Sequence, residues 1–217
     1  MRHIGEIVKG WYNSRSEYLT WLKHDLADCN SILELGCGSY SPLLKIGYGF
    51  KTDALDIFQP YVDKHNAAHN FRKCWQADIC NMEWPAENSY DAVVIFDVME
   101  HLPRPFVENG NYLFKNMERC ARKKVICFTP NGFIENDLVD DDPWQEHISA
   151  WMPEDYIKRG YKVRGATGFR FLFGVGSRHK YRPYWLFAHL GLLSVALVHY
   201  WPGAAWHSYA VKEIGNE

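Results

Sequence analysis

Two glycines and two acids around a predicted turn have the clearest chemical meaning in this sequence. Gly36 and Gly38 follow the apolar run 31–35, and the missing Cβ atoms allow a ligand to lie against backbone N–H groups. Glu34 comes just before this turn, and Asp56 ends a second apolar run 20 residues after Gly36. A carboxylate at that second place can accept hydrogen bonds from both hydroxyls of a ribose. The pattern therefore predicts a nucleoside ligand.

The charges distinguish two kinds of nucleoside. A dinucleotide site uses a third glycine where this chain has Ser41, and its diphosphate would lie unfavourably close to Glu34. S-adenosylmethionine (SAM) carries a cationic sulfonium and an ammonium group, so an acid beside the turn favours it. A nicotinamide-dependent oxidoreductase is therefore the weaker alternative.

Four segments resemble, in order and spacing, the motifs of class I SAM-dependent methyltransferases of the small-molecule, type 11 branch. They are LELGCGS, ALDIF, WQADI and YDAVVIFDVMEHL, and the resemblance covers roughly residues 25–165. It implies that Asp56 binds the ribose, that Asp78 faces the adenine amino group, and that Asp97 lines the methionine end. Tyr40 departs from the family, in which many members carry glycine. The cofactor-binding residues implied are Glu34, Gly36, Cys37, Gly38, Asp56, Ile57, Asp78, Ile79, Phe96 and Asp97.

Each of the three main acids also has a structural interpretation. Asp56 could cap a helix, Asp78 could be a solvated turn residue, and Glu34 could accept hydrogen bonds from nearby backbone N–H groups. The cofactor interpretation is favoured because it accounts for all three positions together.

Two histidines are candidates for the chemistry. Methyl transfer from a sulfonium is an in-line displacement, in which the protein chiefly orients the acceptor. A general base is needed only where the acceptor loses a proton, as a hydroxyl does. His101 follows the fourth apolar run in DVMEHL, and His147 lies in DPWQEHISAW. Either ring could instead have a structural role, such as a hydrogen bond to a turn.

The composition disfavours metals and nucleic acids as ligands. The six cysteines include no C-x-x-C pair, which favours reduced thiols over a zinc site. Acids in 139–144 could suggest magnesium, but consecutive acids of an extended loop cannot all face one ion, so we expect a solvated loop and no metal. The net charge of −2 gives no general attraction to nucleic acid. The partner expected is a small-molecule acceptor.

Strand and helix patterns alternate over the first 130 residues and predict one α/β domain. We expect a Rossmann-like, doubly wound, mostly parallel seven-stranded sheet with helices on both faces and a helical insertion before the last strand. Residues 1–30 would form a helical cover, 31–130 the cofactor-binding core, and 131–217 the lid and acceptor-side elements. The predicted strands are 31–35, 52–58, 72–79, 90–99, 123–130, 161–167 and 205–213, and the predicted helices are 15–28, 42–47, 59–69, 105–121 and 152–160.

Residues 184–201 contain no Lys, Arg, Asp or Glu and follow the basic segment SRHKYR. We favour a helix that covers the acceptor pocket. A contact with a second subunit and a membrane-surface contact through 178–201 are less favoured, and a membrane span is least favoured. The N-terminus has no apolar signal-peptide core, which predicts a cytoplasmic protein.

The sequence as a whole predicts an enzyme that transfers a methyl group from SAM to an oxygen or nitrogen of a small molecule, which could be sugar-like or lipid-linked. The product of the cofactor would be S-adenosylhomocysteine. A non-catalytic module that keeps the fold for binding is the main alternative.

Overall fold

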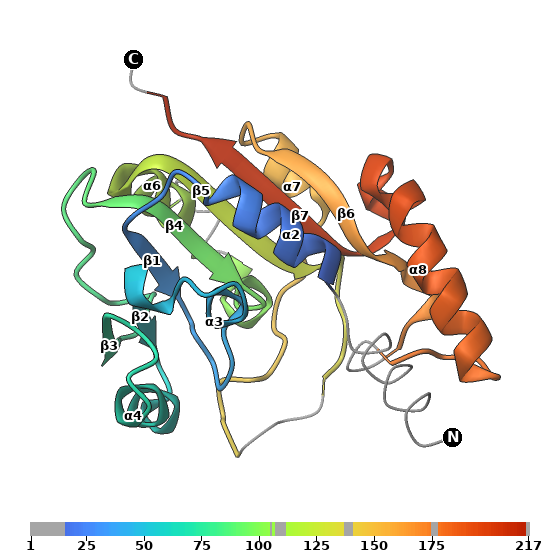
Figure 1. The fold of residues 1–217 in the computed structure, drawn as a ribbon, viewed down its shortest axis with the longest axis horizontal. Coiled ribbons are helices and arrows are strands. Elements are labelled where there is room, and N and C mark those ends of the chain that lie inside the picture. The colour runs from blue at the N-terminus through green and yellow to red at the C-terminus, as the bar shows by residue number, and fades with distance from the viewer. Residues whose placement is uncertain (1–15, 105, 107–111, 137–140, 175–177, 216–217) are drawn as a thin grey trace.

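A seven-stranded sheet forms the centre of the computed structural model, which describes residues 16–104, 106, 112–136, 141–174 and 178–215 (Figure 1). The strand order is β3-β2-β1-β4-β5-β7-β6. Strands β1 to β5 are parallel, and β7 runs antiparallel to both β5 and β6. The predicted fold class is confirmed. The strands are β1 Ile32–Leu35, β2 Thr52–Asp56, β3 Lys73–Gln76, β4 Tyr90–Phe96, β5 Ala121–Pro130, β6 Lys162–Phe169 and β7 Ala205–Glu213.

Helices cover both faces of the sheet. Leu22 of α2 and Leu43 of α3 pack in one apolar cluster, whereas Phe114 of α6 and Tyr156 of α7 pack in another. The α-helices are α2 Ser16–Asp25, α3 Pro42–Lys45, α4 Gln59–Ala67, α6 Tyr112–Cys120, α7 Pro153–Ile157 and α8 Tyr184–Tyr200, and the 3₁₀ helices are η1 Gly49–Lys51, η2 Met99–His101, η4 Arg170–Leu172 and η6 Pro202–Ala204.

Strand β4 shows why the sheet is buried on both sides. Val93 and Ile95 belong to the cluster under α6 and α7, while Val94 belongs to the cluster under α2 and α3. Side chains alternate between the faces of a strand, so a continuous apolar run is the pattern expected of a strand covered twice.

Local sequence determines where several elements begin and end. Helix α3 begins at Pro42 because the Ser41 hydroxyl accepts a hydrogen bond from the Leu43 N–H and proline suits the first helical position. Strand β3 ends before its predicted limit because the chain turns at Asp78. Residue 15 of the predicted helix 15–28 and residues 105 and 107–111 of the predicted helix 105–121 lie outside the described residues.

The topology brings the carboxyl ends of β1, β2, β3 and β4 to one edge of the sheet. Strand β1 lies between β2 and β4, so the strand order reverses at β1, with β2 and β3 on one side of it and β4 and β5 on the other. Ligands of open α/β sheets bind in the crevice at such a switch in strand order.

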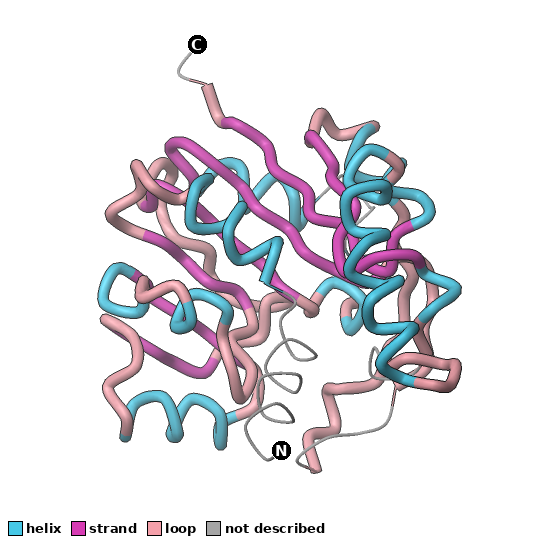
Figure 2. The backbone as a smooth tube through the Cα atoms, turned by 45° about the vertical axis from the view of Figure 1, so that its right-hand side comes forward, coloured by secondary structure: helices cyan, strands magenta, loops and turns pink. Residues whose placement is uncertain are grey.

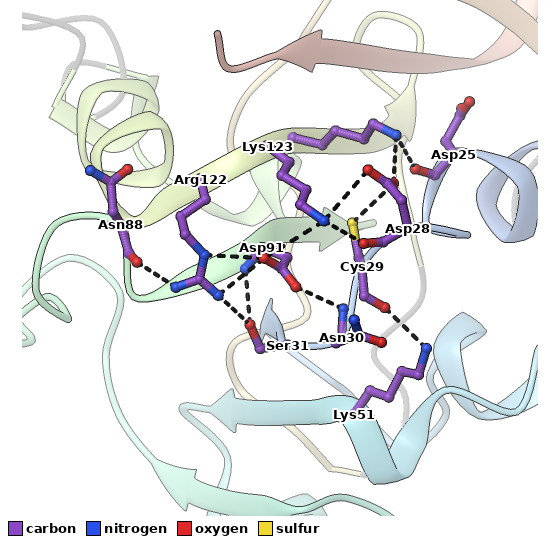
Figure 3. Close-up of polar contacts among 11 residues, drawn as sticks. Asp25, Asp28, Cys29, Asn30, Ser31, Lys51, Asn88, Asp91, Arg122 and Lys123 are labelled. Carbon is purple, nitrogen blue, oxygen red and sulfur yellow. Dashed lines mark hydrogen bonds and ion pairs between the residues drawn. The ribbon is translucent and has the colours of Figure 1, made fainter. Parts of the chain in front are cut away.

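A network of polar contacts holds the opposite, amino-terminal ends of β1, β4 and β5 together (Figure 3). The Asp91 carboxylate accepts hydrogen bonds from the Asn30 N–H at 2.8 Å and from the Arg122 Nε at 3.1 Å. The Arg122 side chain also donates to the Asn88 carbonyl and the Ser31 hydroxyl. Charges at the starts of three strands are thereby paired at the end of the sheet away from the switch point.

Helix α8 packs closely against β6, as both ribbon views show (Figures 1 and 2). A Cβ added to Gly165 would lie 2.1 Å from the Val198 carbonyl oxygen, and one on Gly168 would lie 2.6 Å from the Gly191 carbonyl oxygen. The Ser194 hydroxyl accepts a hydrogen bond from the Phe169 N–H at 2.9 Å. The backbones of α8 and β6 are therefore in direct contact, with no side chain of Gly165 or Gly168 between them.

The other side of α8 is exposed and apolar, with Leu193 71% and Leu197 61% exposed. Among the described helices, none combines the length and the apolar character that crossing a membrane requires. The contacts with a second subunit or a membrane surface considered for this segment stay predictions.

Replacement of Asp91 by alanine tests the amino-terminal network. We expect Asp91→Ala to lower the free energy of unfolding by about 1–3 kcal/mol, because it leaves the Asn30 N–H without its acceptor and removes the carboxylate that pairs with Arg122. Asp28→Ala is the matched control, since that carboxylate is 56% exposed and its pairs should contribute less than about 1 kcal/mol. Urea denaturation measures both, and equal losses would contradict the assignment.

Candidate active site

A cavity of about 1100 Å³ lies at the carboxyl edge of the sheet, at the switch in strand order. Every residue predicted to bind the cofactor lines it, although these residues come from four separate strand ends. The lining from this side consists of Glu34, Gly36, Cys37, Gly38, Asp56, Ile57, Asp78, Ile79, Phe96 and Asp97. The parallel topology thus brings residues from motifs that are far apart in the sequence to one cavity.

The turn after β1 depends on its glycines. Gly36 and Gly38 have φ of 73° and 55°, in the left-handed region that glycine adopts without strain. A Cβ on Gly36 would also lie 2.4 Å from Cγ2 of Val98, so the turn packs directly against the chain after β4. Tyr40, the departure from the family pattern, lines the cavity while remaining 57% exposed.

Asp56 connects the turns that follow β1 and β2. One carboxylate oxygen accepts a hydrogen bond from the Gly38 N–H at 2.8 Å, and the other accepts one from the Phe58 N–H at 2.9 Å. Burial raises the pKa of this carboxyl, and the two backbone hydrogen bonds oppose the rise. Each oxygen keeps a second lone pair, so the group can still accept from hydroxyls of a ligand in the cavity.

Glu34 is a buried carboxyl at the floor of the same turn, with 1% of its surface exposed. The Ser41 hydroxyl lies 2.8 Å and 2.7 Å from its two oxygens and can donate to either. Burial is the largest influence and raises the pKa of Glu34 to about 8. Around pH 7 the carboxyl is therefore mostly protonated, and a ligand cation in the cavity would favour its ionised form.

Asp78 and Ile79 form the wall that follows β3. The Asp78 carboxylate accepts hydrogen bonds from the Cys80 N–H at 2.8 Å and the Asn81 side chain at 2.6 Å. It therefore shapes its own turn and also lines the cavity, and its contact with adenine stays a prediction. Ile79 is 6% exposed and offers an apolar surface to the same space.

All six cysteines are free thiols, in keeping with the expectation of reduced cysteines. The Cys37 and Cys74 sulfur atoms lie 4.0 Å apart beneath the β1 turn. Cys37 thus contributes to the cavity wall from a buried position.

His101 and His147 lie together although 46 positions separate them in the sequence. Their ring centroids are 4.7 Å apart in an edge-to-face arrangement. His101 lines the cavity, whereas the cavity lining does not include His147. Burial lowers the pKa of both rings, so both are neutral near pH 7. The His147 Nε2 lies 4.0 Å from a carboxylate oxygen of Glu100, a residue that the sequence analysis did not single out.

Asp97 directly follows β4 and lines the cavity. Its φ of 50° is unusual for a residue with a side chain, and its N–H donates to the Phe128 carbonyl at 2.8 Å. One carboxylate oxygen lies 3.8 Å from Nε2 of His207. The hydrogen bond to β5 thus fixes the backbone of Asp97, while its side chain lines the cavity.

The sequence analysis missed Asp142. We expected a solvated loop at 139–144, but Asp142 is 2% exposed and lines the cavity. Its carboxylate accepts a hydrogen bond from the Trp144 N–H at 2.9 Å, which folds the chain back on itself. The Asp-Pro-Trp sequence is a turn signal that could have indicated this geometry. Asp141 is exposed, as expected for that loop, and residues 139 and 140 lie outside the described residues.

The far wall of the cavity comes from the segment before the last strand. Ala188, Leu192 and Val195 of α8 line it, together with Arg178 and His179. One side of α8 therefore lines the same cavity as the residues predicted to bind the cofactor.

A doubly wound sheet with a glycine turn after β1 and a carboxylate at the end of β2 defines a nucleoside-binding α/β protein. Residues 33–129, which contain these features, match a family model described as "Methyltransferase domain". Residues 33–129 thus form a SAM-dependent methyltransferase domain, with SAM as its cofactor. No curated protein matches the chain.

Solved structures share the fold at low sequence identity. The methyltransferase domain of bacterial CtHen1 is 14% identical, with a TM-score of 0.52 over 92% of this chain and 98% of that one. Magnesium protoporphyrin IX methyltransferase (ChlM) from Synechocystis PCC 6803, solved with bound SAM, is 13% identical, with a TM-score of 0.52 over 94% and 79%. The [4+2]-cyclase SpnF is 11% identical, with a TM-score of 0.57 over 90% and 79%. These similarities concern the fold alone.

Glu34 makes cofactor binding depend on pH. We expect SAM binding at pH 7 to release a proton, because the cationic ligand favours the ionised form of a carboxyl whose pKa is about 8 in the empty site. Affinity should therefore rise from pH 6 to about pH 8 and then level off. Calorimetry in two buffers of different ionisation enthalpy measures the released proton.

Glu34→Gln should remove the proton release, while the exposed Glu154→Gln should keep it. Proton uptake, or release that survives Glu34→Gln, would contradict this role.

Asp56→Ala should weaken SAM binding by roughly 10- to 100-fold, the equivalent of one to two charged hydrogen bonds. The variant removes the expected ribose acceptor and also frees the Gly38 N–H. Asp63→Ala on α4 is the control, since this exposed side chain accepts a hydrogen bond from its neighbour Gln59. Unchanged affinity of a folded Asp56→Ala variant, measured by calorimetry, would refute the assignment.

Proposed function

We propose that the chain transfers the methyl group of SAM to an oxygen or nitrogen of a small molecule, with sugar-like and lipid-linked compounds as the best candidates. The extent of the cavity carries this proposal. A single space of about 1100 Å³ runs from the turns after β1 and β2 to α8, and so has room for a nucleoside and an acceptor side by side.

The lining of the acceptor side supports a molecule with both polar and apolar parts. Leu192 and Val195 present apolar surface from α8, whereas Arg178, His179 and Thr167 present polar groups. A hydrogen-bonding or anionic part of the acceptor would face the second group, and a carbon-rich part would lie along the helix. This combination suits a sugar derivative or a lipid-linked sugar better than a purely apolar compound.

The reaction needs few protein groups beyond those that position the ligands. The acceptor atom forms a bond to the methyl carbon while the carbon–sulfur bond breaks. The electron pair of the broken bond stays on sulfur, which gives S-adenosylhomocysteine with a neutral sulfur. A hydroxyl acceptor must also lose its proton. His101 is the proposed acceptor of that proton, because its ring is neutral and lines the cavity. His147 would help to orient the His101 ring, through the contact between the two rings.

The alternatives from the sequence make different demands on this site. A nicotinamide dinucleotide would need a third glycine where this chain has Ser41, and its diphosphate would hold the buried Glu34 in its protonated form. A binding module without catalysis needs no second ligand, and the space that extends to α8 argues against it.

A transfer assay tests the proposal. SAM with a deuterated methyl group is incubated with a panel of nucleotide sugars, glycolipids, phenols and amines, and mass spectrometry detects the labelled product and S-adenosylhomocysteine. His101→Gln should lower turnover of a hydroxyl acceptor by about 10²- to 10⁴-fold with the affinity for S-adenosylhomocysteine unchanged. The exposed His24→Gln is the matched control. Tight cofactor binding without transfer to any panel member would favour the non-catalytic alternative.

A further inference from the structure

We propose that Glu100, His101 and His147 form a binding site for a first-row divalent cation such as Zn²⁺ or Mn²⁺ at the acceptor end of the cavity. The role of the cation rests on the proposed function, but the existence of the site does not. From the sequence we expected no metal, because there is no C-x-x-C pair and the consecutive acids at 139–144 cannot all face one ion.

The side chains converge from two segments. One ligand atom from each of the three residues lies within 4.8 Å of the other two, and the His147 Nε2 is 4.0 Å from the nearer Glu100 oxygen. Within the described residues, no other group of three His, Cys, Asp or Glu side chains is as close. An inward shift of each side chain by a fraction of this separation would bring the atoms to metal-binding distances.

Hydrogen bonds already select the form of each ring that binds metals. The His101 Nδ1 lies 3.0 Å from the Glu146 carbonyl oxygen, and the His147 Nδ1 lies 2.6 Å from the Ile134 carbonyl oxygen. A carbonyl only accepts, so each Nδ1 carries the proton and each neutral ring keeps a lone pair on Nε2. Such a hydrogen bond to a backbone carbonyl is the usual second-shell support of a metal-bound histidine.

Glu100 is held in place in the same manner. The Thr129 hydroxyl donates to one carboxylate oxygen at 2.7 Å, while the other oxygen is the one nearest to His147. The Glu100 carbonyl accepts from the N–H groups of Ile148 and Ser149 at 2.9 and 3.0 Å. These bonds attach the segment that carries His147 to η2, so the cluster is preorganised by the protein itself.

The electrostatics of the cluster call for a cation. Two imidazole lone pairs and a carboxylate are acceptors, and acceptors that face one another are stabilised by a positive charge between them. A proton on Glu100 is the competing solution, since burial raises the pKa of this carboxyl to about 7. Titration with Zn²⁺ and Co²⁺ distinguishes a bound metal from a shared proton.

The donor set indicates the class of metal and of acceptor. Two imidazoles and one carboxylate suit Zn²⁺, Mn²⁺ or Fe²⁺ better than Mg²⁺, which prefers oxygen ligands throughout. Three protein ligands leave a coordination position open, and His101 connects the site to the cavity. An acceptor hydroxyl bound there would lose its proton to solvent more readily, which makes the acceptor an oxygen nucleophile.

Metal titration of the chelator-treated, full-length protein tests the site. We expect one Zn²⁺ per chain by calorimetry, and one Co²⁺ whose visible absorption bands report nitrogen and oxygen ligands. Glu100→Gln and His147→Gln should each weaken binding by more than about 10- to 100-fold, the range seen for second-shell changes alone. The His24→Gln variant should bind as the unaltered protein does, because that side chain is 86% exposed and remote from the cluster.

Three outcomes would overturn the site: no binding of either metal, equal binding by the variants, or a cobalt–thiolate absorption band that places the ion on a cysteine. Calorimetry with S-adenosylhomocysteine establishes that each variant is folded, so a loss of metal binding cannot be attributed to unfolding. If metal binding fails but methyl transfer proceeds, the proposed function stands with His101 as the base. If the metal binds but no acceptor is methylated, the site stands and the proposed function fails.

Discussion

The bidentate contact of Asp56 is the constraint on which the arrangement of this site depends. Its two oxygens hold the Gly38 and Phe58 N–H groups, so one side chain determines how the turns after β1 and β2 lie relative to each other. The β1 turn also packs against Val98 after β4, with no room for a Cβ on Gly36. One carboxylate and one glycine thus couple the ends of three strands. These contacts determine the shape of the cavity beside the turns after β1, β2 and β4.

Residues that follow buried strands could be predicted from the sequence alone. Asp56 ends the buried strand β2 and Asp78 follows strand β3, and parallel strands bring their carboxyl ends to one edge, so local patterns were enough to place them together. The boundaries were less accurate where a side chain ends an element early. β3 stops at Gln76 because Asp78 turns the chain through its own hydrogen bonds, which an apolar pattern does not reveal.

The acceptor side could not be predicted in the same way. The contact of Glu100 with His147 and the burial of Asp142 both depend on how an irregular segment folds back over η2. Such a segment has no periodicity, and its path is determined by contacts such as those of the Glu100 carbonyl with Ile148 and Ser149. His207 near Asp97 is a similar case, because it requires β7 to be inserted beside β5.

The backbone contact between α8 and β6 bears on how the choice of acceptor can change. Gly165 and Gly168 leave no space between strand and helix, and Ser194 bonds across the junction, so the helix cannot tilt away without separating from the sheet. The width of the cavity on its proposed acceptor side is thereby fixed by the fold. Evolution or engineering of a new specificity would act by exchanging the inward side chains at positions 188, 192 and 195, whereas a bulkier residue at 165 or 168 would dislodge the whole wall.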